Sequence, residues 1–427
     1  MRVQDNIKNF DDLSINVSDM AVTTEYNFHK LDIPFIDLST VFLVGVDVGF
    51  SSVKVYSVYG RHKFPSLVYP IEAEDIKKVL FKKDTFIAYR DKDKTGKTWL
   101  VGDVISETKH EKIADEYKLF TEKRVGSDEN IVLNRVGIAL SLMQKPGKFK
   151  RDAEIKIAVG LPEEYDLYAS TLIDQLSGYH EFELQIGKNE EWIPVSFIIR
   201  EENIDVLSQP FGTLLSIAVN RKGEVIDEYL LQRAKCCVCD SGFLTSDTFI
   251  LQGGMVGDCI TWENRAMKAI YEKLLDKCKA ATNRDLGLHQ INNYLMQPKE
   301  KRYISYGRGG SWQIDPVLNE LIDQFAKENI KELSTFYDNF NEIDLMIMTG
   351  GTSKLYYPYF IVGLPNLEIR IAEKHDSKKD YENFNCVFAN CVGFFNYVIM
   401  KYRAEINFTE PKEEIINEAA ATEIETL

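Results

Sequence analysis

The chain has 427 residues, of which 44% are hydrophobic and 11% aromatic, and its formal net charge is −15. This length exceeds one ordinary hydrophobic core, so we expect two or more domains. The acidic charge argues against direct binding to nucleic acid or to an anionic membrane surface, because both need clustered Lys and Arg. Any contact with DNA would therefore pass through a basic partner protein.

The cysteines favour a reducing compartment. There are seven of them, an odd number, which suits free thiols better than a disulfide framework. Cys236, Cys237 and Cys239 resemble half of a metal site, but no second pair follows and they enter an apolar strand, so we interpret them as core residues. We expect no signal peptide and no membrane span, and hence a cytoplasmic protein.

The first half of the chain reads as an extension followed by a hairpin-rich sheet. Residues 1–40 are mixed and polar, and we expect them to be partly ordered at best. Gly, Pro and Asp-Lys turns then separate short apolar runs, which predicts strands. These strands are expected at 41–47, 52–59, 61–69, 84–90 and 98–103. A helix at 130–145, with apolar residues at helical spacing, and a buried strand at 153–162 follow.

The second half interleaves strands and helices, which indicates an α/β fold. Strands are expected at 191–207, in a hairpin over 235–254, in a run ending at Thr349, and at 368–373. Helices are expected at 211–220, 260–279, 317–337 and 385–402. The final residues, 409–427, form an acidic tail that we expect to be frayed.

One short stretch imitates a P-loop. Thr95-Gly96-Lys97-Thr98 matches the end of that motif, but Asp91 stands where its first glycine belongs. The stretch also lies between two expected strands, with no helix to follow. We interpret it as a charged hairpin turn.

An internal repeat carries the functional prediction. "VGVDVGFSSVKVY" and "VCDSGFLTSDTFIL" each contain an apolar strand, Asp-x-Gly, hydroxyl residues and a second apolar strand. The matched positions are Asp47 with Asp240, Gly49 with Gly242, and Ser51-Ser52 roughly with Thr245-Ser246. Such a repeat predicts two structurally equivalent domains.

The repeated bend suits a grip on phosphate. A glycine lets backbone N–H groups approach an anion, and Ser or Thr adds hydroxyl donors. The carboxylates of Asp47 and Asp240 would hold the water shell of a Mg²⁺ ion, since this ion takes few protein carboxylates. Lys54 would add a point charge. The alternative for one bend alone is an ordinary hairpin turn, which two copies and Lys54 make less favourable.

A third element lies in "LMIMTGGTSKL". A buried strand ends at Thr349, and Gly350-Gly351-Thr352 opens the next segment. Glycines at the carboxyl end of a strand permit a ring or ribose to pack on the backbone. A plain strand-to-helix turn is the alternative for this motif alone.

Taken together, these motifs resemble the actin fold superfamily, whose phosphate-1, phosphate-2 and adenosine motifs occur in this order. The sequence is most similar to the ParM-type actin-like proteins, which segregate plasmids. "KFPSLV", "VGD", "AVGLPEEY" and "VLSQPFGTLL" are also similar, in the expected order, and the resemblance covers residues 41–405. It implies duplicated ribonuclease H-like domains around a nucleotide cleft.

The resemblance also implies domain boundaries and a catalytic position. Domain I would comprise 41–205, domain II 206–385, and a closing helix at 386–408 would return to domain I. Gln209, before a proline and a short helix, is similar to the family's residue that orients the attacking water. The alternative is that Gln209 only begins the helix.

The predicted protein is a Mg²⁺-dependent ATPase, with GTP as an alternative nucleotide, that polymerises with itself and segregates plasmids through a ParR-like adaptor on centromere DNA. The rivals are a small-molecule kinase of the same fold and a nucleotide-gated scaffold. Its predicted catalytic residues are Gln209, Asp240 and Asp47, of which both aspartates would bind Mg²⁺ through water. The predicted nucleotide-binding residues are Gly49, Phe50, Ser51, Ser52, Lys54, Ser241, Gly242, Phe243, Leu244, Gly350, Gly351 and Thr352.

Overall fold

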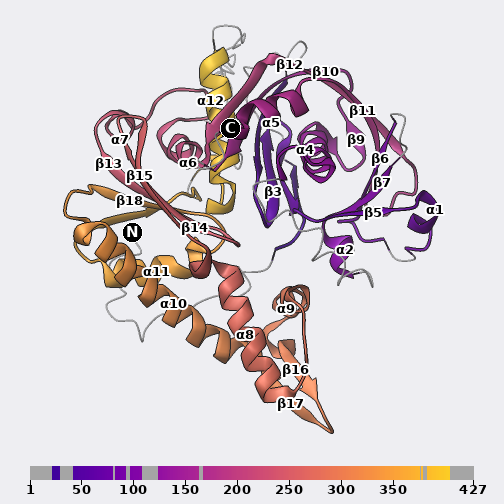
Figure 1. The fold of residues 1–427 in the computed structure, drawn as a ribbon. Helices are drawn as coiled ribbons and strands as arrows, with labels where there is room; N and C mark the ends of the chain where they lie inside the picture. Colours follow the sequence, from indigo (N-terminus) through magenta and orange to yellow (C-terminus); the bar gives the residue numbers. More distant parts are fainter. Residues whose placement is uncertain are drawn as a thin grey trace, which may run out of the picture.

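The chain is described by a computed structural model over residues 22–28, 42–79, 82–92, 97–107, 124–162, 167–375, 377 and 382–403. It has two α/β halves, each built on one large sheet, with α12 (Ala389–Tyr402) between them (Figure 1). The predicted α/β class is confirmed. The expected acidic tail and the Thr95–Gly96 part of the P-loop-like stretch lie outside the described residues.

The first half contains a ten-stranded mixed sheet in the order β1-β4-β3-β2-β10-β12-β11-β6-β7-β5. Its strands are β1 (Glu25–Phe28), β2 (Phe42–Val48), β3 (Ser52–Ser57), β4 (Gly60–Pro65), β5 (Val68–Ile71), β6 (Ile87–Asp91), β7 (Thr98–Val101), β10 (Ala153–Leu161), β11 (Gly178–Ile186) and β12 (Ile193–Ser208). β10 runs parallel to β2 and β12, and the other pairs are antiparallel. Both faces of β2 are buried, which explains its continuous apolar run.

The second half contains a five-stranded sheet in the order β15-β14-β13-β18-β19. Its strands are β13 (Lys235–Ser241), β14 (Ser246–Gln252), β15 (Met255–Trp262), β18 (Leu345–Thr349) and β19 (Glu368–Ile371). Three antiparallel strands are followed by two parallel ones, and β4-β3-β2-β10-β12 of the first sheet repeats this order and these directions. The structure thus confirms the predicted duplication, and it gives β1 no counterpart among the described strands of the second half.

Helices and two small hairpins complete the fold (Figure 1). In the first half they are α1 (Ala73–Ile76), α2 (Asp103–Glu107), α4 (Asp128–Ser141), α5 (Ala169–Leu176), and the β8 (Met143–Lys145) and β9 (Lys148–Phe149) hairpin. In the second half they are α6 (Gln209–Ala218), α7 (Glu228–Gln232), α8 (Met267–Thr282), α9 (Leu288–Leu295), α10 (Ile314–Phe336), α11 (Ser353–Gly363), and the β16 (Tyr303–Tyr306) and β17 (Gly310–Gln313) hairpin. In the described segments, no helix combines the length and hydropathy that a membrane crossing requires.

Several expected elements have different bounds in the structure, and three of them show why. The strand at 61–69 is two strands, because Pro65 lacks an N–H and a tight turn follows it. The helix at 130–145 ends at Ser141, and the next residues form the β8–β9 hairpin. The helix at 260–279 begins only at Met267, because the residues up to Trp262 pair with β14. Sheet pairing overrides local helical periodicity there.

The two halves meet where α6 crosses α12. A Cβ built on Gly393 of α12 would overlap the carbonyl oxygen of Gly212 in α6, so only glycines allow this approach. Helix α12 also packs on β2 and β10, and its Asn396 donates to the carbonyls of Leu215 and Val219 at the end of α6. The crossing therefore fixes β2 of the first sheet relative to the start of the second half.

Candidate functional site

The first predicted phosphate hairpin joins β2 and β3. Asp47 lies directly across from Lys54, and the N–H of Gly49 donates to the carbonyl of Ser52 at 3.1 Å. Nζ of Lys54 lies 3.2 Å from Oδ2 of Asp47, whose side chain is only 3% exposed. The lysine charge is thus held at the base of the turn by the carboxylate, where it can still face an anion bound in the turn.

The second hairpin joins β13 and β14 in the same way. Asp240 lies directly across from Asp247, and the N–H of Gly242 donates to the carbonyl of Thr245 at 2.9 Å. Oγ1 of Thr245 donates to Asp247 at 2.7 Å. The second hairpin therefore carries a carboxylate at the position where the first carries an ammonium.

This register corrects the predicted match between the hydroxyl residues. The glycine N–H closes each turn on the carbonyl three residues later, which is Ser52 in the first hairpin and Thr245 in the second. Ser52 is therefore the counterpart of Thr245, one position away from the match expected from the sequence. The sequence comparison aligned hydroxyl groups, whereas the backbone hydrogen bonds define equivalent positions.

Asp240 is a buried acid whose pKa is raised. Burial, and after it the nearby carboxylates of Asp247 and Asp47, raise its pKa to about 7, against the opposing effects of Lys54 and of a hydrogen bond from Asn390. That bond runs from Nδ2 of Asn390 to Oδ2 of Asp240 at 3.3 Å. The carboxylates of Asp47, Asp240 and Asp247 together place an excess of negative charge at the cleft. A bound cation would neutralise this charge.

The donor set fits Mg²⁺ held through water. Within the described ranges, no three His, Cys, Asp or Glu side chains converge closely enough to bind a metal directly. Mg²⁺ keeps several of its waters and binds through few carboxylates together with phosphate oxygens. Asp47, Asp240 and Asp247 can therefore accept hydrogen bonds from such waters, and the two predicted metal residues are compatible with this role.

The Gly350–Gly351 turn is joined to the second hairpin. Strand β18 runs parallel to β13 and places Thr349 beside Asp240. Gly350 has a φ of +88°, and a Cβ there would overlap Oδ1 of Asp240. Thr352 donates through its N–H to the carbonyl of Ser241 at 2.9 Å and through Oγ1 to that of Gly242 at 2.8 Å. The predicted adenosine turn thus lies beside the second hairpin.

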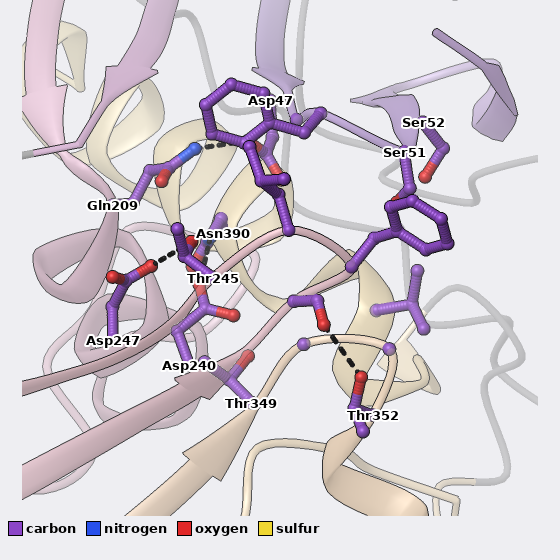
Figure 2. Close-up of a pocket in the computed structure, with 18 of the residues that line it drawn as sticks. Asp47, Ser51, Ser52, Gln209, Asp240, Thr245, Asp247, Thr349, Thr352 and Asn390 are labelled. Atoms are coloured by element: carbon purple, nitrogen blue, oxygen red, sulfur yellow. Dashed lines mark hydrogen bonds between the residues drawn. The ribbon is translucent and has the colours of Figure 1, made fainter. Parts of the chain in front are cut away.

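Gln209 reaches the cleft from the first residue of α6. Strand β12 ends at Ser208, and Pro210 follows in the first helical turn, where a proline is tolerated. Nε2 of Gln209 donates to Oδ1 of Asp47 at 2.9 Å, as the dashed line in Figure 2 shows. Gln209 therefore both begins the helix and points toward the first hairpin.

The predicted residues share one cleft, with one exception. Figure 2 shows the side chains of Gln209 and Asp47 on one side and those of Asp240, Thr245 and Thr352 on the other. Every predicted site residue except Ser241 lines this cleft. The side chain of Ser241 is buried, and its Oγ lies 3.3 Å from Oγ of Ser246. Ser241 contributes to the site through its backbone carbonyl, which accepts a hydrogen bond from the N–H of Thr352.

The cleft contains residues that the sequence analysis missed. Asp247 is the counterpart of Lys54 in the repeat, a relation that the seven-residue spacing from each Asp would have revealed. Asn390 lies on α12, and Thr213 of α6 donates to its Oδ1 at 2.6 Å. A buried Asn in an apolar helix needs a polar partner, which was an available signal. Arg124 also lines the cleft and donates to the carbonyl of Val48 at 2.7 Å.

Comparison with known proteins places the fold. Residues 45–212 match the family model of the actin-like proteins' N-terminal domain, and no curated protein matches the sequence. A 15-stranded ParM filament from Clostridium botulinum is similar over 84% of this chain and 99% of its own, with a TM-score of 0.63 and 18% identity. Bacillus thuringiensis ParM with ADP covers 84% of this chain and 99% of its own, at a TM-score of 0.57 and 14% identity.

A third solved structure agrees with these two. The actin-like protein Alp7A is similar over 85% of this chain and 97% of its own, with a TM-score of 0.61 and 13% identity. Sequence identities of 13–18% show a shared fold only. The match of residues 45–212 to the actin-like N-terminal domain is a similarity of sequence. Together they confirm the predicted resemblance to actin-like proteins: the chain has the fold of ParM and Alp7A, and residues 45–212 match the actin-like N-terminal domain.

Proposed function

We propose that this protein is a Mg²⁺-dependent ATPase that assembles into nucleotide-dependent filaments and drives plasmid segregation through an adaptor bound to centromere DNA. The observation that carries the proposal is the pair of equivalent hairpins, whose acids Asp47 and Asp240 line one shared cleft. The adenosine turn lies beside the second hairpin. This arrangement suits a nucleotide with a metal-bound phosphate tail. The substrate of the protein would be ATP or GTP.

The hairpin turns would hold the β- and γ-phosphates. Because Gly49 and Gly242 use their own N–H groups to close the turns, we expect the phosphate donors to be the N–H groups that follow each glycine. These belong to Phe50 and Ser51 in the first turn and to Phe243 and Leu244 in the second. Mg²⁺ would neutralise phosphate charge when it is bound, and Lys54 would add a further positive charge.

Gln209 would orient the attacking water. Its Nε2 is fixed by Asp47, which leaves the carbonyl oxygen Oε1 to accept a hydrogen bond from water. Phosphoryl transfer needs mostly placement and electrostatic stabilisation from the protein. The fixed amide and the flanking carboxylates can supply both. Loss of the γ-phosphate would remove contacts shared by the two hairpins, so the cleft could relax and weaken contacts between subunits.

The filament and its cargo are proposed from the fold. Among proteins with this fold, a ParM from Clostridium botulinum forms a filament. Head-to-tail contacts between identical subunits generate an open polymer when their rotation does not close. The net charge of −15 disfavours direct contact with DNA, so a ParR-like adaptor would connect the filament to the plasmid.

The test is phosphate release from ATP and GTP across a titration of Mg²⁺, with and without added small-molecule acceptors such as sugars or acetate. We expect Mg²⁺-dependent release without an acceptor. Phosphate transfer that occurs only with an acceptor would favour a kinase instead. Nucleotide binding without turnover would favour a nucleotide-gated scaffold.

A further inference from the structure

The segment from Val22 to Phe28 lies against both halves of the molecule. Strand β1 within it pairs with β4, so it adds an edge strand to the first sheet. The equivalent edge strand of the second sheet, β15, has no such neighbour among the described strands. The segment is therefore an addition to the duplicated fold, and its position needs a separate explanation.

The attachment to the first half is extensive. Glu25 forms a 2.6 Å ion pair with Lys63 of β4, and the rings of Tyr26 and Phe28 pack on buried His62, with centroids 6.0 and 5.1 Å away. The N–H of Thr24 donates to Oδ2 of Asp103 at 2.9 Å. Backbone pairing, ring packing and these polar contacts together fix the segment to the first sheet.

The attachment to the second half that the described residues show is made by the side chain of Asn292. The N–H of Val22 donates to Oδ1 of Asn292 at 2.8 Å, and Nδ2 of Asn292 donates back to the carbonyl of Val22 at 3.1 Å. Asn292 lies on α9, which is anchored in the second core by buried Ile291 and Leu295. One amide thus satisfies both backbone groups of one residue, as a neighbouring strand would.

This contact lies at the nucleotide cleft. Val22 lines the cleft that contains the two hairpins. Thr23 and Glu25 line the adjoining pocket beyond Gly351, and Lys63 belongs to both cavities. A nucleotide that extends from the hairpins past the Gly350–Gly351 turn would therefore lie beside this segment.

We propose that Val22–Phe28 is a clasp that forms one wall of the nucleotide site and joins the two domains beside it, so that nucleotide exchange requires the release of Val22 from Asn292. The crossing of helices α6 and α12 already joins the two halves. In Figure 1 these helices lie in the upper part of the molecule, whereas α9 lies in the lower part. The clasp adds a connection on the side of α9, which opposes domain separation. The inference rests on the proposed nucleotide binding and concerns how the nucleotide is retained.

The first experiment measures the dissociation of a fluorescent ADP from the Mg²⁺-loaded full chain after a chase with excess ATP. Asn292→Ala removes both hydrogen bonds to Val22, and we expect dissociation to be about ten-fold faster, in line with the usual worth of two neutral hydrogen bonds. Deletion of residues 1–28 should accelerate it at least as much. Asn293→Ala, one residue along the same helix, is the control and should stay within about two-fold of the unaltered protein.

Dissociation rates unchanged by Asn292→Ala would overturn the proposal. A cysteine pair tests it without removing any segment: Val22→Cys with Asn292→Cys, in a Cys259→Ser background because the side chain of Cys259 is exposed. We expect the pair to oxidise, to slow dissociation at least ten-fold, and to release nucleotide again on reduction. Failure to crosslink, or a crosslinked protein that releases nucleotide at the original rate, would contradict the clasp.

The experiments distinguish a failure of the proposed function from a failure of the clasp. If the unaltered protein binds no fluorescent ADP, the proposed function fails, whatever the crosslink does. If it binds ADP but all variants release it equally, only the clasp fails.

Discussion

Gln209 donates from Nε2 to Oδ1 of Asp47 at 2.9 Å, while Lys54 occupies the other carboxylate oxygen at 3.2 Å. The carboxylate is thus held from both sides, by the first residue of α6 and by the neighbouring strand. This links the helix that enters the second half to the hairpin of the first. Any displacement of the hairpin would therefore move the amide that we expect to orient the attacking water.

Gln209→Ala should slow phosphate release while assembly persists. The substitution removes the amide that would orient water but leaves both hairpins, so we expect release to fall by about 10²-fold. Single-turnover phosphate release, together with pelleting of the same sample, checks both parts. Gln232→Ala, an exposed residue of α7, is the control. Equal phosphate release by Gln209→Ala and the unaltered protein would remove Gln209 from the mechanism.

Asp240→Asn should stabilise the ligand-free protein at high pH. Burial raises the pKa of Asp240 to about 7, so between about pH 4 and pH 7 the folded chain keeps a proton that the unfolded chain releases. The stability due to this group therefore falls as the pH rises through that window. At pH 8 the buried carboxylate is charged, and its replacement should raise the free energy of unfolding by about 2–4 kcal/mol.

Denaturant unfolding at pH 8 and near pH 4, without Mg²⁺ or nucleotide, measures this difference. The gain should nearly vanish at the lower pH, where the folded state is protonated and the unfolded state is close to its own pKa. Hydrolysis should be lost at either pH, because the amide cannot supply the negative charge that attracts the metal. Asp258→Asn on exposed β15 is the matched control. A destabilised Asp240→Asn protein at pH 8 would contradict the electrostatic account of the site.

Gly393→Ala should destabilise the fold. A methyl group there would overlap the carbonyl oxygen of Gly212, and two packed helices cannot yield without separating. We expect the free energy of unfolding to fall by about 3 kcal/mol, the upper range for an overpacked core. Thermal or denaturant unfolding measures it. Gly257→Ala, where the nearest atom to the added Cβ is at 3.6 Å, should cost far less, and equal effects would show that the crossing is not close-packed.

The sequence predicts the parts of the site that depend on local patterns. The two Asp-x-Gly bends and the Gly350–Gly351 turn each follow an apolar strand, and this local signal does not depend on distant residues. Gln209 was found only through the family resemblance, because its proximity to Asp47 depends on how α6 meets β2. The register of the hydroxyl residues was one position off, since backbone hydrogen bonds and not residue types define it.

Features that depend on a distant partner were not predictable. Strand β1 has no apolar alternation, and its pairing is decided by β4, whose His62 packs on the rings of Tyr26 and Phe28. The contact between Val22 and Asn292 joins residues 270 positions apart. Asn390 reads as an interruption of an apolar helix until the helix is seen to place it against Asp240. The sequence therefore predicts the hairpins better than the contacts that connect the domains.

The most direct test of the proposed function is light scattering of the purified chain, with pelleting, when nucleotide and Mg²⁺ are added. The account predicts that scattering rises on addition of ATP with Mg²⁺ above a critical concentration and is abolished by removal of Mg²⁺. It also predicts that scattering decays as phosphate is released and persists longer in Gln209→Ala. The absence of any polymer over a wide range of protein concentrations, with ATP or GTP and Mg²⁺ present, would contradict it.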